Sequence, residues 1–513
     1  MSETRGRGGW SAAFVVAVML WAGPALVLPA GTVLVLWAGT AQAQTAPVGD
    51  SQTTVHGYVQ PTTPGAPGAP VQGPGGSPIQ GDQGPPVEGT VQSTAPGYVD
   101  TPTAVQESVK GRGRPEFDPI GVPLNDVANG LGRLAIGRDR VLPAKTDAFL
   151  GSFVANTRME AQASHDSNLY RTQTGTIADD LLVFRPSLTV GSDWANDELK
   201  FDMSGEIGRY RRTGSEDYQD YSLGVSGRLD VVEAESLSAS LRFDHLHVQR
   251  GSPDDPGSPV PTLYNTTTLD LGHRLDGGTL FSRAKAQARY FDYLHNGGIE
   301  NDDRDRAEVT LSERLGIEYV PGTQAWIEPG ANTRRYVRGD FNGVTDRSSS
   351  GGQVLAGMTW DYSGITYFEF GAGYLTQSYD SPQFTTIKGP AVNGKAVWNA
   401  TELLTISGNV GRRVNETVAV GESGYLATTY GLSADWEALY NLIADVSYRR
   451  ETDDYRGGLV RNDTLNGWST GLRYLFGRHW YAEARYFYDD RSSTNRTNDY
   501  TDQRFLLTLG EQL

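Results

Sequence analysis

The sequence contains no cysteine and, outside one segment near its start, no long apolar run. With 0 Cys in 513 residues, disulfide frameworks, thiol nucleophiles and thiolate metal sites are excluded. Basic residues are in the minority, with 44 Lys and Arg against 61 Asp and Glu and a formal net charge of -17. This balance argues against nucleic acid as a partner, because phosphate binding relies on a concentrated basic surface.

Glycine and aromatic residues are abundant instead. The chain has 62 Gly, 25 Tyr and 10 Trp, and its mean hydropathy is -0.42. Such a composition is typical neither of a helical membrane protein nor of a Leu-rich soluble enzyme. It fits the strands of a transmembrane β-barrel, in which only every second residue faces lipid.

The long apolar segment near the start, Trp10 to Ala43, ends in Ala41-Gln42-Ala43. A basic start, an apolar stretch and a small-x-small end predict a secretory signal peptide over residues 1–43, cleaved before Gln44. The alternative is a transmembrane helix, because the stretch is long for a signal peptide. Two prolines inside it and the closing motif favour cleavage.

Two segments separate the signal from the main domain. Residues 44–113 are rich in Pro, Gly, Gln, Thr and Ser and predict a disordered periplasmic tether, because they carry too little apolar surface to offset the entropy of ordering. Residues 114–146 form a pre-barrel segment, in which Asn125 to Leu134 is compatible with a short helix. We expect this segment to lie at the barrel mouth or to enter the lumen as a partial plug.

Residues 147–513 alternate apolar and polar side chains in runs of ten or so, the period of a strand with one lipid face and one wet face. Short turns alternate with longer polar loops between the runs, as in bacterial barrels. The fold class predicted is therefore all-β, a transmembrane antiparallel up-and-down barrel of about eighteen strands. The runs start near Ala148, Leu181, Glu198, Tyr218, Ser236, Leu263, Gly278, Arg306, Thr323, Gly352, Ile365, Gln383, Thr401, Tyr425, Leu439, Leu465, His479 and Thr501.

The phase of each run assigns its faces, because a charged residue facing the middle of the bilayer is costly. In the run from Leu280, the alanines share one face with Leu280, and Arg283, Lys285 and Arg289 share the other. The same reasoning along the chain predicts a lumen lined by charges of both signs: Arg158, Arg185, Arg228, Arg242, Arg283, Lys285, Arg289, Arg314, Arg334, Lys395, Arg449, Arg473, Arg485, Asp202, Glu206, Asp244, Glu318, Glu328, Glu369, Asp445 and Glu483. Most of these charges are expected only to solvate and cross-link the wall, but Arg283, Lys285 and Arg289 form a basic stripe that could favour anionic solutes.

Some residues do not fit this scheme. Glu313 falls on the lipid face of a regular run, which we interpret as a bulge or a shift of register. Arg209, Arg335 and Arg412 also fall there, but near loop ends, where snorkelling makes the cost small. Tryptophans at the ends of runs predict an interfacial girdle: Trp194, Trp360, Trp398, Trp436 and Trp480.

No arrangement of residues predicts catalysis, a metal site or a cofactor. His245 and His247 lie two apart, which places them on one strand face near a loop end, where a role in the aromatic belt is favoured over metal binding. Nucleotide-binding, calcium-binding and nucleophile-elbow motifs are absent. We therefore expect that the chain is not an enzyme.

Three stretches carry a resemblance to a known class. Arg114 to Gly121, His165 to Arg171 and Asp220 to Asp230 resemble the β-barrel porin families of Gram-negative bacteria, over roughly residues 114 to 513. The resemblance implies a structural scaffold with no catalytic residues, and it suggests a companion of exopolysaccharide synthesis and export. One departure is the final strand, where such barrels usually close with an aromatic residue and this chain ends in Leu513.

These observations predict an outer-membrane pore for hydrophilic solutes, with exopolysaccharide translocation as one form of it. The expected partners are outer-membrane lipid, the outer-membrane assembly machinery and periplasmic polysaccharide-export components. The alternative is a plugged structural barrel that anchors or docks periplasmic or surface partners.

Overall fold

A computed structural model describes residues 59–61, 91–93, 148–149 and 152–512, apart from 254, 296, 299, 339–345, 363–364, 418–421, 458–460 and 477–478. The predicted signal peptide and the pre-barrel segment lie outside the described residues. So does the predicted tether, except for β1 (Val59–Pro61) and β2 (Val91–Ser93), which pair antiparallel in a small sheet of their own.

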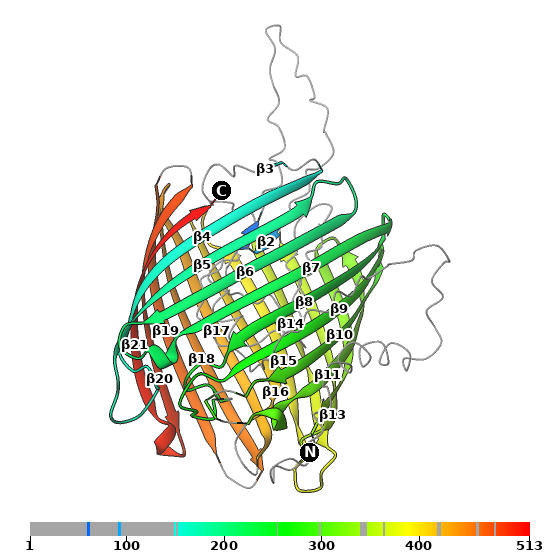
Figure 1. Ribbon diagram of the computed structural model, residues 1–513. Coiled ribbons are helices and arrows are strands. Elements are labelled where there is room, and N and C mark those ends of the chain that lie inside the picture. The colour runs from blue at the N-terminus through cyan, green and yellow to red at the C-terminus, as the bar shows by residue number, and fades with distance from the viewer. Residues whose placement is uncertain are drawn as a thin grey trace, which may run out of the picture. The chain divides into compact units, whose positions relative to one another are not determined.

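The main domain is a closed antiparallel barrel of 18 strands, so the predicted fold class is confirmed (Figure 1). Each strand pairs with its neighbours in the sequence, and β21 returns to β4 through the pairs Arg504↔Asp166 to Gln512↔Arg158. The strands are β4 (Phe153–Asp166), β5 (Asp179–Ser192), β6 (Glu198–Tyr210), β7 (Tyr218–Val232), β8 (Glu235–His247), β9 (Leu263–Gly277), β10 (Leu280–Tyr293), β11 (Arg306–Val320), β12 (Thr323–Tyr336), β13 (Ser349–Tyr362), β14 (Thr366–Tyr379), β15 (Ile387–Asn399), β16 (Leu404–Asn415), β17 (Glu422–Leu439), β18 (Leu442–Gly457), β19 (Asn462–Phe476), β20 (Trp480–Ser493) and β21 (Tyr500–Gln512), with the short β3 (Ala148–Phe149) paired to the start of β4.

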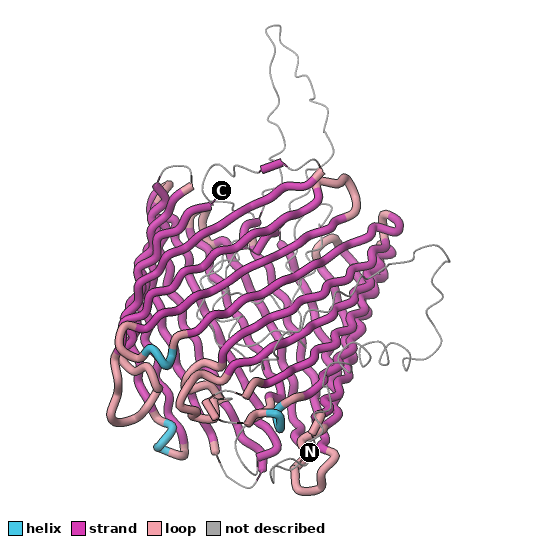
Figure 2. Tube along the Cα trace, viewed as in Figure 1, coloured by secondary structure: helices cyan, strands magenta, loops and turns pink. Residues whose placement is uncertain are grey.

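The connections alternate in length around the barrel. Short turns such as 278–279 and 321–322 lie at one end, where Gly278 (φ 77°) and Gly322 (φ 84°) adopt the left-handed backbone that tight turns need. Longer loops lie at the other end and include the 3-10 helices η2 (Gly214–Glu216), η3 (Asp302–Arg304) and η4 (Arg496–Asn498), drawn in cyan in Figure 2. We call these the short-turn end and the long-loop end. In outer-membrane barrels they are the periplasmic and the extracellular end.

The two faces of the wall differ as the alternation predicts. Leu315 is 47% exposed, whereas its neighbour Arg314 is 4% exposed. The outer face is defined here as the one carrying the exposed apolar residues, and the inner face is the opposite one. The five predicted girdle tryptophans are all exposed, and all lie at the short-turn end.

One seam in the wall is incomplete. β15 and β16 pair only between Asn393↔Gly411 and Asn399↔Thr405, in the half nearer the short-turn end. Beyond Asn393, β15 stays paired to β14 as far as Ile387, and β16 stays paired to β17 as far as Asn415. The parts of β16 and β17 nearest the long-loop end therefore leave the neighbouring strand β15, and together with Glu416 and Thr417 they form what we call the inner hairpin, residues 412–417 and 422–429.

Candidate functional site: the inner wall of the barrel

The side chains predicted to line the lumen all lie on the face opposite the exposed apolar residues. Those that are buried are Arg158, Arg185, Arg228, Arg314, Lys395, Arg473, Arg485, Glu206, Asp244, Glu328, Glu369 and Glu483. Those that are partly buried are Arg242, Arg283, Lys285, Arg289, Arg334, Arg449, Asp202, Glu318 and Asp445. That they line a solute channel stays a prediction.

Ion pairs between neighbouring strands cross-link this face. Arg185 donates from Nε to Glu206 at 2.7 Å, and Arg473 does the same to Glu483 at 2.7 Å. Arg314 donates to Glu328 at 2.5 Å and reaches further to Glu369 on β14 at 3.0 Å. Because buried charges are tolerated only when they are paired and hydrogen-bonded, these pairs explain how so many charges can share one face.

Two further ion pairs span a whole strand. Arg485 on β20 donates to Asp445 on β18 at 2.6 Å, and the residue between them on β19 is Gly471. Arg449 on β18 donates to Asp489 on β20 at 3.4 Å, and the residue between them is Gly467. A Cβ at Gly467 would stand 2.6 Å from Asp489 Oδ1, so glycine is what lets these side chains meet above β19.

Glycines also receive aromatic rings on the inner face. Four aromatic side chains lie across a glycine that is their direct cross-strand partner: Tyr218 on Gly208, Phe281 on Gly316, Trp326 on Gly357 and Tyr481 on Gly510. A Cβ at any of these glycines would overlap the ring. The rings therefore lie flat along the wall, where the hydroxyl of Tyr218 donates to Glu206 at 2.5 Å and the indole of Trp326 donates to Thr359 at 3.1 Å.

The predicted basic stripe lies on β10. Arg283 has its guanidinium 4.7 Å from the ring centre of Phe281, and Arg289 lies 5.7 Å from that of Phe291. Arg283 is also 3.9 Å from Asp276, at the long limit of an ion pair. These cation–π contacts hold both guanidinium groups against the wall.

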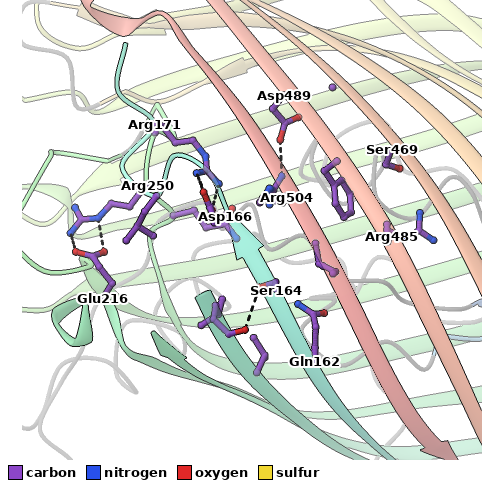
Figure 3. A pocket seen from close by; sticks show the side chains of 18 of the residues that line it. Gln162, Ser164, Asp166, Arg171, Glu216, Arg250, Ser469, Arg485, Asp489 and Arg504 are labelled. Atoms are coloured by element: carbon purple, nitrogen blue, oxygen red, sulfur yellow. Dashed lines mark hydrogen bonds and ion pairs between the residues drawn. The ribbon is translucent and has the colours of Figure 1, made fainter. Parts of the chain in front are cut away.

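A cavity of about 170 Å³ lies on the inner side near the long-loop end (Figure 3). Of the predicted residues, Arg185, Glu206, Asp445, Arg449 and Arg485 line it. They meet there because β4 to β6 and β18 to β20 come together around the closure of the barrel at β21.

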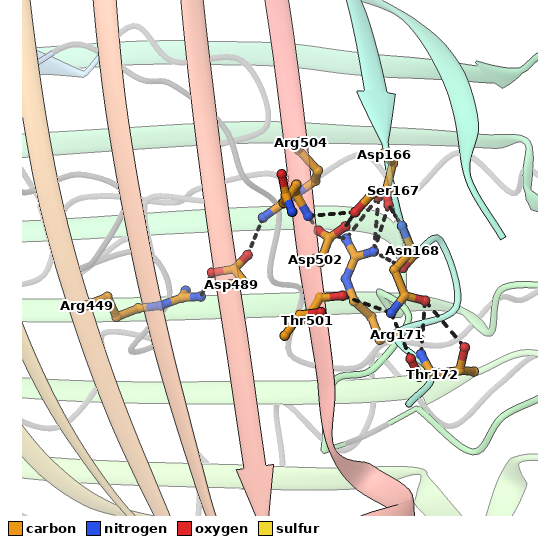
Figure 4. A network of polar contacts seen from close by, with 11 residues as sticks. Asp166, Ser167, Asn168, Arg171, Thr172, Arg449, Asp489, Thr501, Asp502 and Arg504 are labelled. Carbon is orange, nitrogen blue, oxygen red and sulfur yellow. Dashed lines mark hydrogen bonds and ion pairs between the residues drawn. The ribbon is translucent and has the colours of Figure 1, made fainter. Parts of the chain in front are cut away.

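Sequence reasoning missed a polar network beside this cavity, built on the loop after β4 (Figure 4). Arg171 donates to Asp166 at 3.0 Å and forms an ion pair with Asp502 on β21 at 3.1 Å, and Arg504 continues the network to Asp489 at 2.6 Å. Burial by itself would lower the pKa of Arg171, but the two aspartates outweigh it and raise that pKa. Arg504 was detectable, since it alternates with the exposed Phe505, whereas Arg171 lies in a loop without any period.

The loop between β8 and β9 extends to strand β20, six strands away around the barrel. Arg250 donates to Glu216 at 2.7 Å, and the carbonyl of the next residue, Gly251, accepts from Arg491 on β20 at 2.7 Å. β8 and β20 are far apart in the order of strands around the barrel. The loop therefore folds over the inner side of the long-loop end.

His245 and His247 do not share a face, contrary to the sequence prediction. His245 stacks on Tyr221, with ring centres 4.9 Å apart. His247 ends β8 and turns inward, where it lies 2.9 Å from Asp220 and its ring lies against that of Tyr218, with ring centres 4.1 Å apart and planes tilted by 32°. The strict two-residue period fails because the strand ends there.

The residues that did not fit the predicted faces are explained without a bulge. Glu313 lies on the outer face in continuous register with β10, so the predicted bulge or register shift is wrong, and Ser282 on the same face donates to it at 2.5 Å. Arg335 is exposed and pairs with Asp380 at 2.7 Å, and Arg209 is exposed and lies 3.8 Å from Asp217. Arg412 lies on the inner hairpin.

In the part of the chain that the structure describes, no helix is both long enough and apolar enough to cross a membrane. Over the same residues, no group of three or more His, Cys, Asp or Glu side chains is arranged to hold a metal ion.

The closed barrel, its exposed apolar outer face and its charged inner face define the class: a porin-like barrel of the outer membrane, serving solute passage. Residues 148–513 match the family described as "putative beta-barrel porin 2", and the chain belongs to that family. The resemblance inferred from the sequence is thereby confirmed.

Solved structures with a similar arrangement are outer-membrane proteins, at low identity. The outer membrane protein OpdK from Pseudomonas aeruginosa is 12% identical over 70% of this chain and 99% of its own, with a TM-score of 0.37. OccAB3 from Acinetobacter baumannii is 11% identical over 70% and 98%, with a TM-score of 0.39. The copper transporter OprC is 11% identical over 72% and 84%, with a TM-score of 0.42. These scores are low, so the assignment rests on the family match. No curated protein matches the sequence.

Proposed function

We propose that this barrel is a passive outer-membrane pore for hydrophilic solutes, and that an exported polysaccharide is one such solute. The observation that carries the proposal is the inner face, where arginines and carboxylates alternate in cross-strand pairs such as Arg185–Glu206 and Arg473–Glu483. These groups donate to and accept from hydroxyl groups and can exchange with uronate carboxylates. A chain of sugar hydroxyls could therefore move along the wall by exchanging hydrogen bonds, without energy input from the barrel.

The proposal extends to targeting and partners. Export would use a signal peptide over residues 1–43, cleaved before Gln44, followed by insertion through the outer-membrane assembly machinery. Periplasmic polysaccharide-export components would then deliver the solute to the short-turn end. We propose no catalytic role for the barrel.

Single-channel recording of the full mature chain in planar bilayers tests the proposal. We expect discrete conductance steps that an acidic oligosaccharide blocks in a concentration-dependent way. Blocking by an acidic but not by a neutral oligosaccharide of equal length would favour uronate-bearing solutes. A folded barrel that inserts and never conducts would overturn the proposal.

The basic stripe gives a sharper arm of the same experiment. Replacing Arg283, Lys285 and Arg289 by glutamine should shift the reversal potential in a salt gradient towards cation preference, because three inner positive charges are removed. Replacing the outer-face Arg209 and Arg335 by glutamine is the matched control and should leave the reversal potential unchanged.

A second candidate is a plugged barrel that serves as an anchor or docking site. The observation that favours it is the inner hairpin, which occupies part of the inner side of the barrel. This candidate would be supported if the barrel does not conduct and if deletion of the protein removes a partner from the cell surface.

A further inference from the structure

In the inner hairpin, residues whose place in the alternation predicts the outer face lie on the inner side of the barrel instead. Along β17, Leu426 is in phase with Leu432 and Trp436, which are 56% and 53% exposed, yet Leu426 is only 1% exposed. Residues 422–429 are buried on both faces, whereas the rest of β17 is largely not buried. The face of the hairpin that carries Leu426 and its cross-strand partner Val414 therefore does not contact lipid.

That face packs against an apolar patch on the inner face of the neighbouring strands. The patch consists of Leu355 on β13, Leu375 on β14 and Ile387 and Ala391 on β15, and it forms one cluster with Val414 and Leu426 of the hairpin. Leu355 and Ile387 are each 1% exposed. Aliphatic side chains gathered on three adjacent strands would be exposed on a wall that carries many charges, and the hairpin covers them.

A polar latch fixes the hairpin to the wall. Arg334 on the inner face of β12 pairs with Glu416 and donates to the carbonyl of Val414 at 2.8 Å. The hydroxyl of Tyr336 donates to the other oxygen of Glu416 at 2.8 Å. A cavity of about 110 Å³ is lined by hairpin residues 413–416 together with inner-face residues of β10 and β11, so the hairpin stands on the inner side of the barrel and not outside it.

The same residues could instead complete the wall. Continuing the β15–β16 register beyond Asn393↔Gly411 would pair Val392 with Arg412 and Ala391 with Arg413. Val414 and Leu426 would then return to the outer face. Gly411 and Gly431 lie where the hairpin leaves the wall and impose little resistance to bending.

Pro390 fits an unpaired edge of β15 in the docked state, in which the hairpin lies against the apolar patch. It lies in the part of β15 that has no partner on β16, and proline has no N–H to give to a strand ladder. The β15–β16 seam can therefore stay unpaired at Pro390, because no backbone N–H loses a hydrogen bond there.

We propose that the inner hairpin is a two-state gate. Docked on the apolar patch, it narrows the long-loop end. Swung outward, it closes the β15–β16 seam and widens the passage. The inference rests on the proposed function, because a gate matters only if solute passes, and the latch of Arg334, Tyr336 and Glu416 sets the balance between the two states.

Cysteine pairs test the swing directly, since the natural chain has 0 Cys. In the outward state, Ala391→Cys and Arg413→Cys would be direct cross-strand partners, at a separation that a disulfide spans. We expect oxidation to form a disulfide between these two cysteines and to raise the single-channel conductance roughly twofold, because the ionic current increases with the width of the passage. Reductant should reverse the increase. Ala391→Cys with Arg412→Cys is the matched control, one residue out of register, and should not cross-link.

The latch is tested by a second readout that does not need conduction. Ser423→Cys, at a position 0% exposed, should react slowly with a membrane-impermeant maleimide. Adding Arg334→Gln should speed the labelling several-fold, whereas adding Arg335→Gln, on the outer face, should not. The gate would be overturned if Ser423→Cys is labelled at the same rate alone and with either arginine substitution. It would also be overturned if the in-register cysteine pair cross-links no better than the control pair.

The two readouts separate the two proposals. If the disulfide forms and labelling is faster in a barrel that never conducts, the proposal of a pore is refuted, whereas the movement of the hairpin is supported. Conductance that stays constant when the in-register pair is oxidised would refute the gate and leave the pore.

Discussion

Arg485 on β20 reaches over Gly471 on β19 to donate to Asp445 on β18, with 2.6 Å between Nη2 and Oδ1. The same arginine also donates from Nε to Glu483 at 2.9 Å. One side chain thus ties β18 to β20, and it can do so only because the intervening residue has no side chain.

Gly471→Ala should break this link. The added Cβ would stand 2.6 Å from Arg485 Nη2 and 2.7 Å from Asp445 Oδ1, so the ion pair must separate. We expect a loss of about 1 to 3 kcal/mol in the free energy of unfolding, as overpacking usually costs. Urea unfolding in detergent measures it. Gly191→Ala, where a Cβ has open space, should change little, and equal effects of the two substitutions would contradict the role given to Gly471.

The ring of Tyr218 lying across Gly208 predicts an energetic coupling between these two residues. Gly208→Ala should destabilise the barrel by displacing the ring from Glu206. The same change in a Tyr218→Leu background should cost less, because no ring is left to displace. A double-mutant cycle gives the coupling, expected at about 0.5 to 3 kcal/mol for residues in contact. A coupling of zero would mean that the ring does not need the glycine.

The assignment of faces on β10 is tested by neighbouring residues. Ala288→Arg places a charge on the outer face, where mid-bilayer arginine costs about 2 to 4 kcal/mol. Gln287→Arg places it on the inner face, beside Asp270, to which Gln287 already donates at 2.9 Å. We expect the first variant to lose heat-modifiable folded barrel in outer-membrane fractions and the second to keep it. The reverse order would mean that the faces are assigned the wrong way round.

Asp305, in the loop before β11, should make stability depend on pH. Burial raises its pKa to about 8, assisted by Asp292 and Asp302 and opposed by the hydrogen bond from the Tyr293 amide. Because the folded state holds the proton more tightly than the unfolded state, this contribution is complete at acid pH and is lost as the pH rises through about 8. Asp305→Asn should reduce the fall in urea midpoint between mildly acidic and alkaline buffer. If the urea midpoint of this variant falls as much as that of the natural chain, groups other than Asp305 cause the pH dependence of stability.

Much of the fold could be predicted from local patterns. The run predicted from Tyr218 coincides with the start of β7, and the one from Arg306 with the start of β11, because a polar loop ends just before each. The run predicted from Ala148 starts at the short β3, five residues before the long strand β4 begins at Phe153. Such ends depend on pairing with a neighbour, which a local pattern does not contain.

The candidate site was less accessible to prediction. Alternation placed Arg314 and Leu315 on opposite faces, but it could not show that Arg314 meets Glu369, three strands away. Nor could it show the inner hairpin, since Leu426 has the pattern of a lipid-facing residue and is buried inside. The reading of Glu313 as a bulge failed for a similar reason, because its partner Ser282 lies on another strand.

The amino-acid sequence alone determined which side of each strand is apolar, how many strands there are and where the chain turns, because these follow from the spacing of neighbouring residues. The tertiary structure decided which charges pair, which glycines receive a ring or an arginine, and which strands leave the wall. Those features depend on distances between residues far apart in the chain, and these distances are set only when the barrel closes.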